Sequence, residues 1–242
     1  MATHLLMRLE APLMSFGATA VDYRRPVQPW PAVSMLTGLL ANALGWQRAD
    51  TTALDRLQAR LLWAARIDRP GLPLNDFQTA QLAKDDKGWT TRGTVEERGG
   101  GPDAYKSPHL RSRDYRADAS VLVAVCLAPA DEYPILQHLA DALDRPARPL
   151  FIGRKGCLPA TRIGLGLVPA EHAVAALSEA DNLLAAVADA SPSADAAIYF
   201  SEGAAPLTPG LFVHHTSDQR RFALDVHAGR QQVYERPARG LT

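Results

Sequence analysis

The stretch ASVLVAVCLA, residues 119–128, is the most informative part of this chain for its fold. β-branched and other apolar residues fill nearly every position, which is typical of a β-strand. DEYPILQHLADAL, residues 131–143, follows as a predicted helix, with Asp131 as its cap and Pro134 in its first turn. PLFIG, residues 149–153, then predicts a short further strand. This half of the sequence therefore indicates a strand–helix–strand unit.

The N-terminal part of the chain predicts a second unit of the same kind. THLLMRLE (3–10) and LLWAARID (61–68) have the composition of strands, and SMLTGLLANALG (34–45) has a helical stripe of apolar residues. Ser34 is predicted to accept the first free amide hydrogen bonds of this helix, and Gly45 is predicted to end it. The order strand, helix, strand, strand, helix, strand predicts an α+β protein with a ferredoxin-like (RRM-like) βαββαβ domain.

The segment from about residue 70 to 118 interrupts this unit. It is poor in apolar periodicity and contains the run RGGGPD, so we expect a long hairpin excursion, or thumb, within a domain of residues 1–165. Residues 166–242 are expected to form a small, acidic, β-rich C-terminal region. Its predicted elements are a helix at about 170–187 and strands at 196–201, 210–215 and 221–227.

Composition places the chain among ordinary globular proteins. Its 242 residues are 47% hydrophobic and 21% charged, no stretch approaches the length of a membrane helix, and two cysteines form no disulfide framework or zinc pattern. The cytoplasm is the expected compartment. The net charge is zero, but residues 163–219 hold seven acids and no Lys or Arg. Such asymmetry suggests two different partners for a basic part and an acidic part, unless the clustering is due to chance.

The basic residues gather in a loop after the predicted strand 149–153. From Arg145 to Arg162 there are five basic residues and no acid, and Gly153-Arg154-Lys155-Gly156 stands among them. Glycines permit close approach of the backbone, and exposed amides with two cations suit a phosphate. The spacing of a P-loop is absent, so nucleotide hydrolysis is not supported. The alternative is a hairpin whose cations are simply solvated.

Two further stretches combine cations with aromatic rings. AYKSPHLRSRDYR (104–116) interleaves basic residues with tyrosines and a histidine, a pattern that suits single-stranded nucleic acid, with a solvated rim as the alternative. VDYRRPVQPWP (21–31) offers two adjacent arginines for the phosphate backbone, whereas we interpret its Trp30 as a core residue. Cys157 is likewise interpreted as a small buried residue at a tight turn.

Three of these stretches also resemble a known family. LEAPLMSFG (9–17), PWPAVSMLTGLLANALGWQRAD (29–50) and PLFIGRKGCLPA (149–160) resemble, in the same order, motifs of the Cascade D-subunit family of type I-E CRISPR systems. That family belongs to the repeat-associated RNA-binding superfamily. Two departures stand out: Val33 occupies a position where the family carries a basic residue, and Leu158 separates Cys157 from Pro159.

The resemblance implies a ferredoxin-like fold with a thumb and a non-catalytic Cascade subunit. Such a subunit caps the 5′ handle of the CRISPR RNA, lies beside the backbone-forming subunits and the large subunit, and meets target DNA through the complex. No cofactor, metal or membrane is implied. The resemblance and the cation pattern together predict these RNA-binding residues: Arg24, Arg25, Ser34, Arg48, Lys106, Arg111, Arg113, Tyr115, Gly153, Arg154 and Lys155.

Two other functions stay open at this point. A related branch of the family, in type I-C systems, cleaves RNA, and Tyr105, Lys106 and His109 could support metal-independent cleavage of repeat RNA here. A protein-only scaffold is the third possibility.

Overall fold

The computed structural model describes residues 1–20, 23–81, 88–89, 95–96, 108–185, 196–227 and 229–238. Within them the chain forms a mixed α/β fold around a mostly antiparallel, nine-stranded sheet. Seven strands follow one another in the order β10-β13-β9-β3-β7-β1-β8, and β2 and β4 pair with β7. The strands are β1 (Ala2–Met14), β2 (Arg24–Arg25), β3 (Leu61–Arg69), β4 (Leu72–Ala80), β7 (His109–Leu127), β8 (Gly164–Ala170), β9 (Ile198–Ser201), β10 (Phe212–Thr216) and β13 (Gln231–Arg236).

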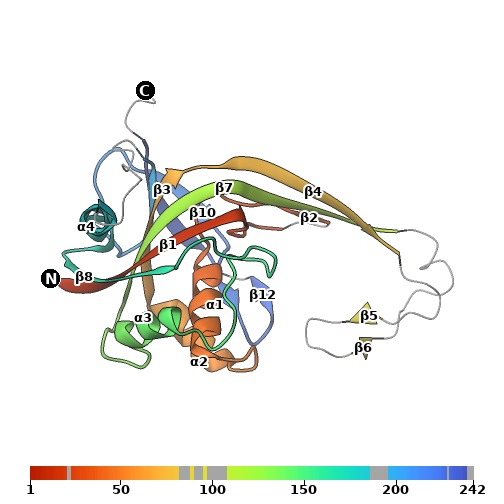
Figure 1. Ribbon diagram of the computed structural model, residues 1–242, viewed down its shortest axis with the longest axis horizontal. Coiled ribbons are helices and arrows are strands. Elements are labelled where there is room, and N and C mark those ends of the chain that lie inside the picture. The colour runs from red at the N-terminus through yellow and green to blue at the C-terminus, as the bar shows by residue number, and fades with distance from the viewer. Residues whose placement is uncertain are drawn as a thin grey trace.

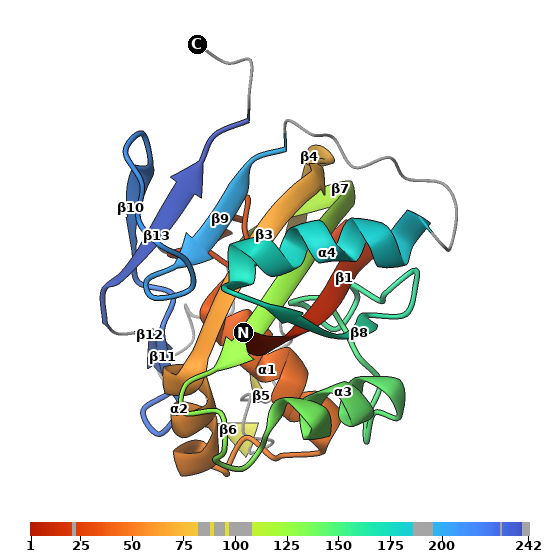
Figure 2. The ribbon, with the colours of Figure 1, turned by 90° about the vertical axis from the view of Figure 1, so that its left-hand side faces the viewer.

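Helices cover both faces of this sheet. They are α1 (Val33–Leu44), α2 (Thr51–Arg60), α3 (Leu136–Asp144) and α4 (Ala173–Ala185). α1 and α3 pack on one face, and α4 crosses the other (Figure 2). Two short pairs of strands stand apart from the sheet: β5 (Gly88–Trp89) with β6 (Val95–Glu96), and β11 (Arg220–Arg221) with β12 (Val226–His227).

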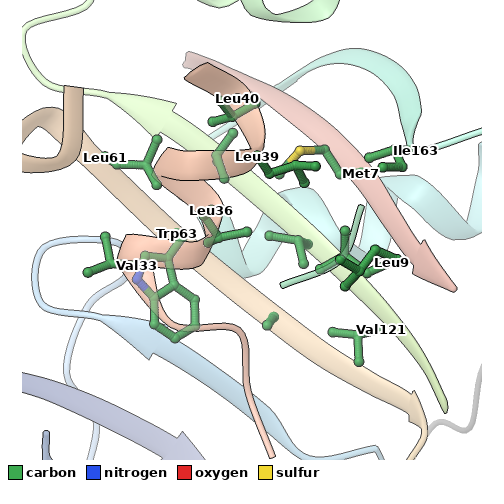
Figure 3. Packing of buried hydrophobic residues seen from close by; sticks show 14 of the residues in the cluster. Met7, Leu9, Val33, Leu36, Leu39, Leu40, Leu61, Trp63, Val121 and Ile163 are labelled. Atoms are coloured by element: carbon green, nitrogen blue, oxygen red, sulfur yellow. The ribbon is translucent and has the colours of Figure 1, made fainter. Parts of the chain in front are cut away.

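The apolar run of β7 explains why both faces need covers. Val121, Val123 and Val125 join the core under α1 and α3, whereas Leu122 and Ala124 join the core under α4. Figure 3 shows the first of these cores, in which residues of α1 lie against Trp63 of β3. A strand that alternates between two buried faces needs apolar residues at every position, and this is the pattern of residues 119–127.

The N-terminal half of β7 leaves the body of the molecule. Its residues from His109 to Ala117 pair antiparallel with the whole of β4, from Ala80 to Leu72. This β4–β7 arm, made of β4 and residues 109–117, extends away from the helices (Figure 1). β2 pairs with β7 in parallel, with Arg24 beside Ser112 and Arg25 beside Arg113.

Most predicted elements exist, with shifted ends. The strands at 3–10 and 61–68 are confirmed as β1 and β3, and the strand at 119–128 is the C-terminal half of β7. The helix at 34–45 is confirmed as α1, and Gly45 ends it at φ 82°. The helix at about 170–187 is α4, and the strands at 196–201 and 210–215 are β9 and β10.

The strand predicted at 149–153 is wrong. These residues form a loop, and the strand that follows α3 is β8. Ile152 is buried in the core and exchanges single backbone hydrogen bonds with Ser15 and Cys157 instead of a ladder. Pro149 and the positive φ of Gly153 interrupt any extended run.

The start of the helix predicted at 131–143 is also wrong, because α3 begins only at Leu136. The carbonyl oxygens of Glu132, Tyr133 and Pro134 accept hydrogen bonds from the guanidinium of Arg60. The side chain of Arg60, which belongs to α2, therefore pairs with the backbone carbonyls that precede α3, and Asp131 does not cap this helix.

Three smaller corrections concern caps and short elements. Ser34 does not cap α1, because the side chain of Asp218 accepts the hydrogen bond of the first amide, that of Val33, at 3.3 Å. The strand predicted at 221–227 is instead the tight β11–β12 hairpin. α2 and β13 were not predicted; in α2 the only buried apolar residues are Leu54 and Leu57.

The domain boundary expected at residue 165 falls inside β8. β8 pairs with β1, β9 pairs with β3, and β13 pairs with β9, so strands from both sides of that boundary share one sheet. No helix in the described ranges is long and apolar enough to cross a membrane.

Candidate nucleic-acid interface

Arg154 lies at the meeting point of three segments. Its guanidinium donates hydrogen bonds to the carbonyl oxygen of Asp114 on β7, at 2.8 Å, and to that of Arg25 on β2, at 3.2 Å. The same guanidinium carbon lies 4.5 Å from the centre of the Tyr115 ring. A guanidinium over an aromatic face is an attractive arrangement, and here it ties the loop 149–163 to the base of the β4–β7 arm.

Gly153 allows this loop to approach β1. It has φ +88°, and a Cβ atom at this position would lie 1.7 Å from the carbonyl oxygen of Ser15. Only glycine fits such a conformation and such a contact. The amide of Ser15 donates to the carbonyl of Ile152 at 3.2 Å, and the amide of Cys157 donates to the carbonyl of Arg154 at 2.8 Å, so the backbone is held on both sides of Gly153.

The β2 strand brings two more cations to the same place. Arg25 lies beside Arg113 in the parallel register, and the amide of Ser112 donates to the carbonyl of Tyr23 at 3.1 Å. Arg24 forms an ion pair of 3.5 Å with Asp114, but 67% of its side chain stays exposed. An exposed ion pair of this length contributes little and leaves Arg24 available to an anion.

The structure thus brings together seven of the eleven predicted residues. Arg24, Arg25, Arg113, Tyr115, Gly153 and Arg154 are joined by the contacts above, and Lys155 follows Arg154 in an exposed position. Arg111 lies two residues farther out on the arm and is exposed. We call these residues, with Arg111, the Arg154 site.

Three predicted residues are not in this site. Arg48 forms an ion pair with Asp225, in the turn between β11 and β12. Ser34 lies in the first turn of α1 and is partly buried. Lys106 lies outside the described residues, as does Tyr105, whereas His109 is the exposed first residue of β7.

Sequence reasoning missed Asp114, which shapes the site, and left Tyr23 out of the predicted RNA-binding residues. Asp114, the only acid of its stretch, accepts from Arg24 and from the amide of Asn75, at 2.5 Å, so it orients groups from both neighbours of β7. Tyr23 is 44% exposed beside Arg24 and offers a ring to a base. The alternation of Asp114 with arginines was a signal for this residue, whereas Tyr23 lies in the stretch 21–31, whose cations and aromatic rings had predicted phosphate clamping and stacking.

Two residues interpreted as structural are confirmed as such. Trp30 is 7% exposed and stacks on Tyr199 at 4.7 Å between ring centres. Cys157 is buried, and burial raises the pKa of its thiol, which leaves it mostly protonated at neutral pH. Burial, together with the nearby Glu235 carboxylate, raises the pKa of Tyr199 to about 12. The rings of Trp30, Tyr199 and His214 pack together, and this packing holds β9 and β10 against the loop that contains β2.

Comparisons with known proteins cover nearly the whole chain. A sequence model of the family described as CRISPR-associated protein (Cas_Cas5) matches residues 4–239. The CRISPR system Cascade subunit CasD of Escherichia coli (strain K12) is 29% identical over 166 residues, which cover 65% of this chain and 67% of that protein.

Two solved structures resemble the fold over nearly its full length. A chain of a CRISPR RNA-guided surveillance complex has a TM-score of 0.62 and 26% identity, and the match covers 97% of this chain and 90% of that one. A crystal structure of a Cas protein has a TM-score of 0.59 and 25% identity, with 97% and 94% covered. Both matches therefore include the arm and the C-terminal strands as well as the central sheet.

Proposed function

Because this chain belongs to the CRISPR-associated protein family Cas_Cas5, which it matches over residues 4–239, we propose that it is a subunit of a Cascade-type surveillance complex. The similar E. coli protein is named a Cascade subunit, and a similar solved chain belongs to an RNA-guided surveillance complex. Other Cascade subunits are then its protein partners, and the chain meets target DNA through them.

Within that complex, we propose that the chain binds the 5′ handle of the CRISPR RNA at the Arg154 site. The observation that carries this proposal is the convergence of β2, β7 and the loop 149–163 on Arg154, because each of these segments also carries an exposed cation: Arg24, Arg111 and Lys155. Arginine and lysine side chains at fixed positions suit the phosphates of a bent single strand.

The topology supports a ferredoxin-like classification. α1 lies between β1 and β3 in the chain, α3 lies between β7 and β8, and the four strands are ordered β3-β7-β1-β8. This is the order of a split βαβ unit. We propose that the β4–β7 arm is the thumb of this fold, and that RNA lies along its base beside Tyr115.

Handle binding is tested by electrophoretic shifts with RNA of the handle sequence, alone and with the partner subunits, over a range of salt concentrations. Each phosphate contact contributes to the slope of log affinity against log salt. We expect binding that weakens steeply with salt. A chain that binds neither the handle nor unrelated RNA would be a protein-only scaffold.

The proposed role is non-catalytic. Cleavage would require a base and a charge-stabilising group held close to the scissile phosphate. We expect no product when purified protein is incubated for hours with precursor RNA in the absence of metal. Specific product that is lost in His109→Ala would instead establish the endoribonuclease.

A further inference from the structure

The loop between β7 and α3, residues 128–135, exposes a cluster of apolar side chains. Five of its eight residues are both apolar and exposed: Ala128, Pro129, Ala130, Tyr133 and Ile135. Tyr133 keeps 64% of its surface exposed, and Ile135 keeps 36%. β7 runs into this loop from the arm, so the loop lies at the opposite end of that strand from the residues of the Arg154 site (Figure 1).

Two side chains of α2 hold the backbone of this loop in place. The guanidinium of Arg60 is fully buried and donates hydrogen bonds to the carbonyl oxygens of residues 129 and 132–134. Arg56 binds the carboxylate of Glu132 through two of its nitrogens, with Nε at 2.7 Å. A loop that is already fixed loses little conformational entropy when it binds, so its exposed side chains are preorganised for a partner.

The ring of Tyr133 is supported without being covered. The imidazole of His138, in the first turn of α3, lies 5.1 Å from it between ring centres. Nδ1 of His138 accepts a hydrogen bond from the amide of Ile135 at 3.3 Å, which ties the imidazole to the start of the helix. Single exposed apolar residues are ordinary, but a cluster of them on a fixed loop indicates an interaction site. An aromatic side chain at the centre of such a cluster is the typical anchor of a protein–protein interface.

The charge of the loop determines which kind of partner fits it. Between Arg116 and Arg145 the sequence contains no Lys or Arg. Asp131 is exposed in the middle of the loop, whereas the charge of Glu132 is balanced by Arg56. Asp131 would repel the phosphates of RNA. A second copy of this chain, related by a two-fold axis through the loop, would bring Asp131 toward its own equivalent, so self-association is also unfavourable. A different protein with cations around an apolar pocket fits best.

We propose that residues 128–135 dock onto a neighbouring subunit of the complex, whose surface offers an apolar pocket to Tyr133 and a basic rim to Asp131. A tyrosine suits this place, because its ring supplies apolar area and its hydroxyl group meets the polar edge of a pocket. This inference rests on the proposed function, since it requires a complex of several subunits. It deepens that function by adding a protein-binding loop at the end of β7 away from the Arg154 site.

The test measures the affinity of the full chain for purified partner subunits, added singly and together, with handle RNA present. Tyr133→Ala should weaken the affinity for one of these subunits by about tenfold or more, the loss expected for an aromatic anchor. Tyr133→Phe keeps the ring and should stay within about threefold of the wild type. Asp131→Lys should weaken the same affinity and alter its salt dependence, because it places a cation against the basic rim. Urea unfolding and the RNA affinity of the free chain should stay unchanged in all these variants.

Leu224→Ala is the matched control, because Leu224 is 62% exposed in the turn between β11 and β12, outside this loop. Wild-type affinity of Tyr133→Ala for every partner subunit would overturn the proposal. Weaker RNA binding by Tyr133→Ala with intact assembly would also overturn it, and would assign the loop to RNA. A dimer of the wild-type chain that Tyr133→Ala abolishes would overturn it in favour of a second copy. A wild-type chain that joins no partner subunit would contradict the proposed function itself, and this inference with it.

Discussion

Two arginines of this chain each donate hydrogen bonds to several backbone carbonyl groups, but their side chains differ in how exposed they are. Arg60 is fully buried, and its guanidinium donates five hydrogen bonds to the carbonyls of residues 129 and 132–134. We call this region the Arg60 corner. Arg154 donates to two carbonyls, lies over Tyr115 and is only partly buried, with exposed cations around it.

This difference distinguishes a structural cation from one at a binding surface. Each nitrogen of the Arg60 guanidinium donates to a carbonyl oxygen of its own chain and the side chain is fully buried, so a ligand cannot reach it, and its role is to hold the segment between β7 and α3. Arg154 uses part of its guanidinium to bond the backbone of the site, and its side chain is only partly buried among basic residues. The same residue type therefore stabilises the fold in one region and builds a candidate interface in the other.

The largest expected effect is at the Arg60 corner. Arg60→Met keeps the apolar stem but removes the donor to four carbonyls, of which that of Pro134 is buried and the others partly so, and an unpaired buried acceptor costs about 1–3 kcal/mol. We expect the free energy of unfolding in urea to fall by about 3 kcal/mol or more. The neighbouring, exposed Arg56→Met is the control and should change it far less. If Arg60→Met unfolds like the wild type, the distinction between the two arginines is lost.

The second effect tests the Arg154 site through its glycine. Gly153→Ala would place Cβ 1.7 Å from a carbonyl oxygen at a positive φ, so the loop must move. We expect a loss of about 2–3 kcal/mol in unfolding free energy, together with weaker RNA binding because Arg154 moves with the loop. Gly156→Ala is the matched control, since nothing lies within 4 Å of a Cβ there. Equal behaviour of the two variants would show that the loop adapts at no cost.

Sequence patterns predicted the parts of the fold that local periodicity determines. The continuous apolar run of β7, the stripe of α1 and the αL glycine at position 45 are each encoded within a few neighbouring residues. The patterns failed where a distant side chain replaces a local signal. Arg60 satisfies the carbonyls before α3, and Asp218 caps α1 from 185 residues away, so neither helix start could be located from its own sequence.

The candidate site, like the fold, could be predicted from the sequence only in part: its segments could be located, but not the contacts between them. Stretches that combine cations with glycines or aromatic rings pointed to β2, β7 and the loop 149–163, because basic clusters with so few acids are unusual in a solvated surface. The sequence did not show that Arg154 bonds two carbonyls whereas the next residue, Lys155, is exposed. It also did not show that Arg48 pairs with Asp225 away from the site. Those differences depend on contacts between segments that are far apart in the chain.

The third prediction concerns an exposed cation of the Arg154 site. Lys155 is exposed, so Lys155→Ala should leave the unfolding free energy unchanged within about 0.5 kcal/mol. It should weaken RNA binding about threefold and reduce the salt slope by about 0.7–0.9, the contribution of one phosphate contact. Arg145→Ala, an exposed cation at the end of α3, is the control. An unchanged slope would remove Lys155 from the interface.

The smallest expected effect concerns the rim of the Arg60 corner. The carbonyl of Glu132 accepts from Arg60 at 2.6 Å, while its carboxylate binds the exposed guanidinium of Arg56. This hydrogen-bonded pair lowers the pKa of Glu132 below its ordinary value. A carboxyl group whose pKa is lower in the folded than in the unfolded chain stabilises the fold at neutral pH, and this contribution disappears as the pH falls through the folded pKa.

Glu132→Gln should therefore unfold slightly more easily than the wild type at pH 7, and the two proteins should converge as the pH falls below about 4. The effect stays small because water and salt screen an exposed ion pair. Thermal melting at several pH values and at two salt concentrations measures it, and RNA binding at pH 7 should not change. A difference that persists at low pH would mean that the amide disturbs the carbonyl held by Arg60. The hydrogen bonds of Arg60 would then depend on the exposed Glu132–Arg56 pair. In that case the Arg60 corner would differ less from the exposed Arg154 site than the burial of Arg60 indicates.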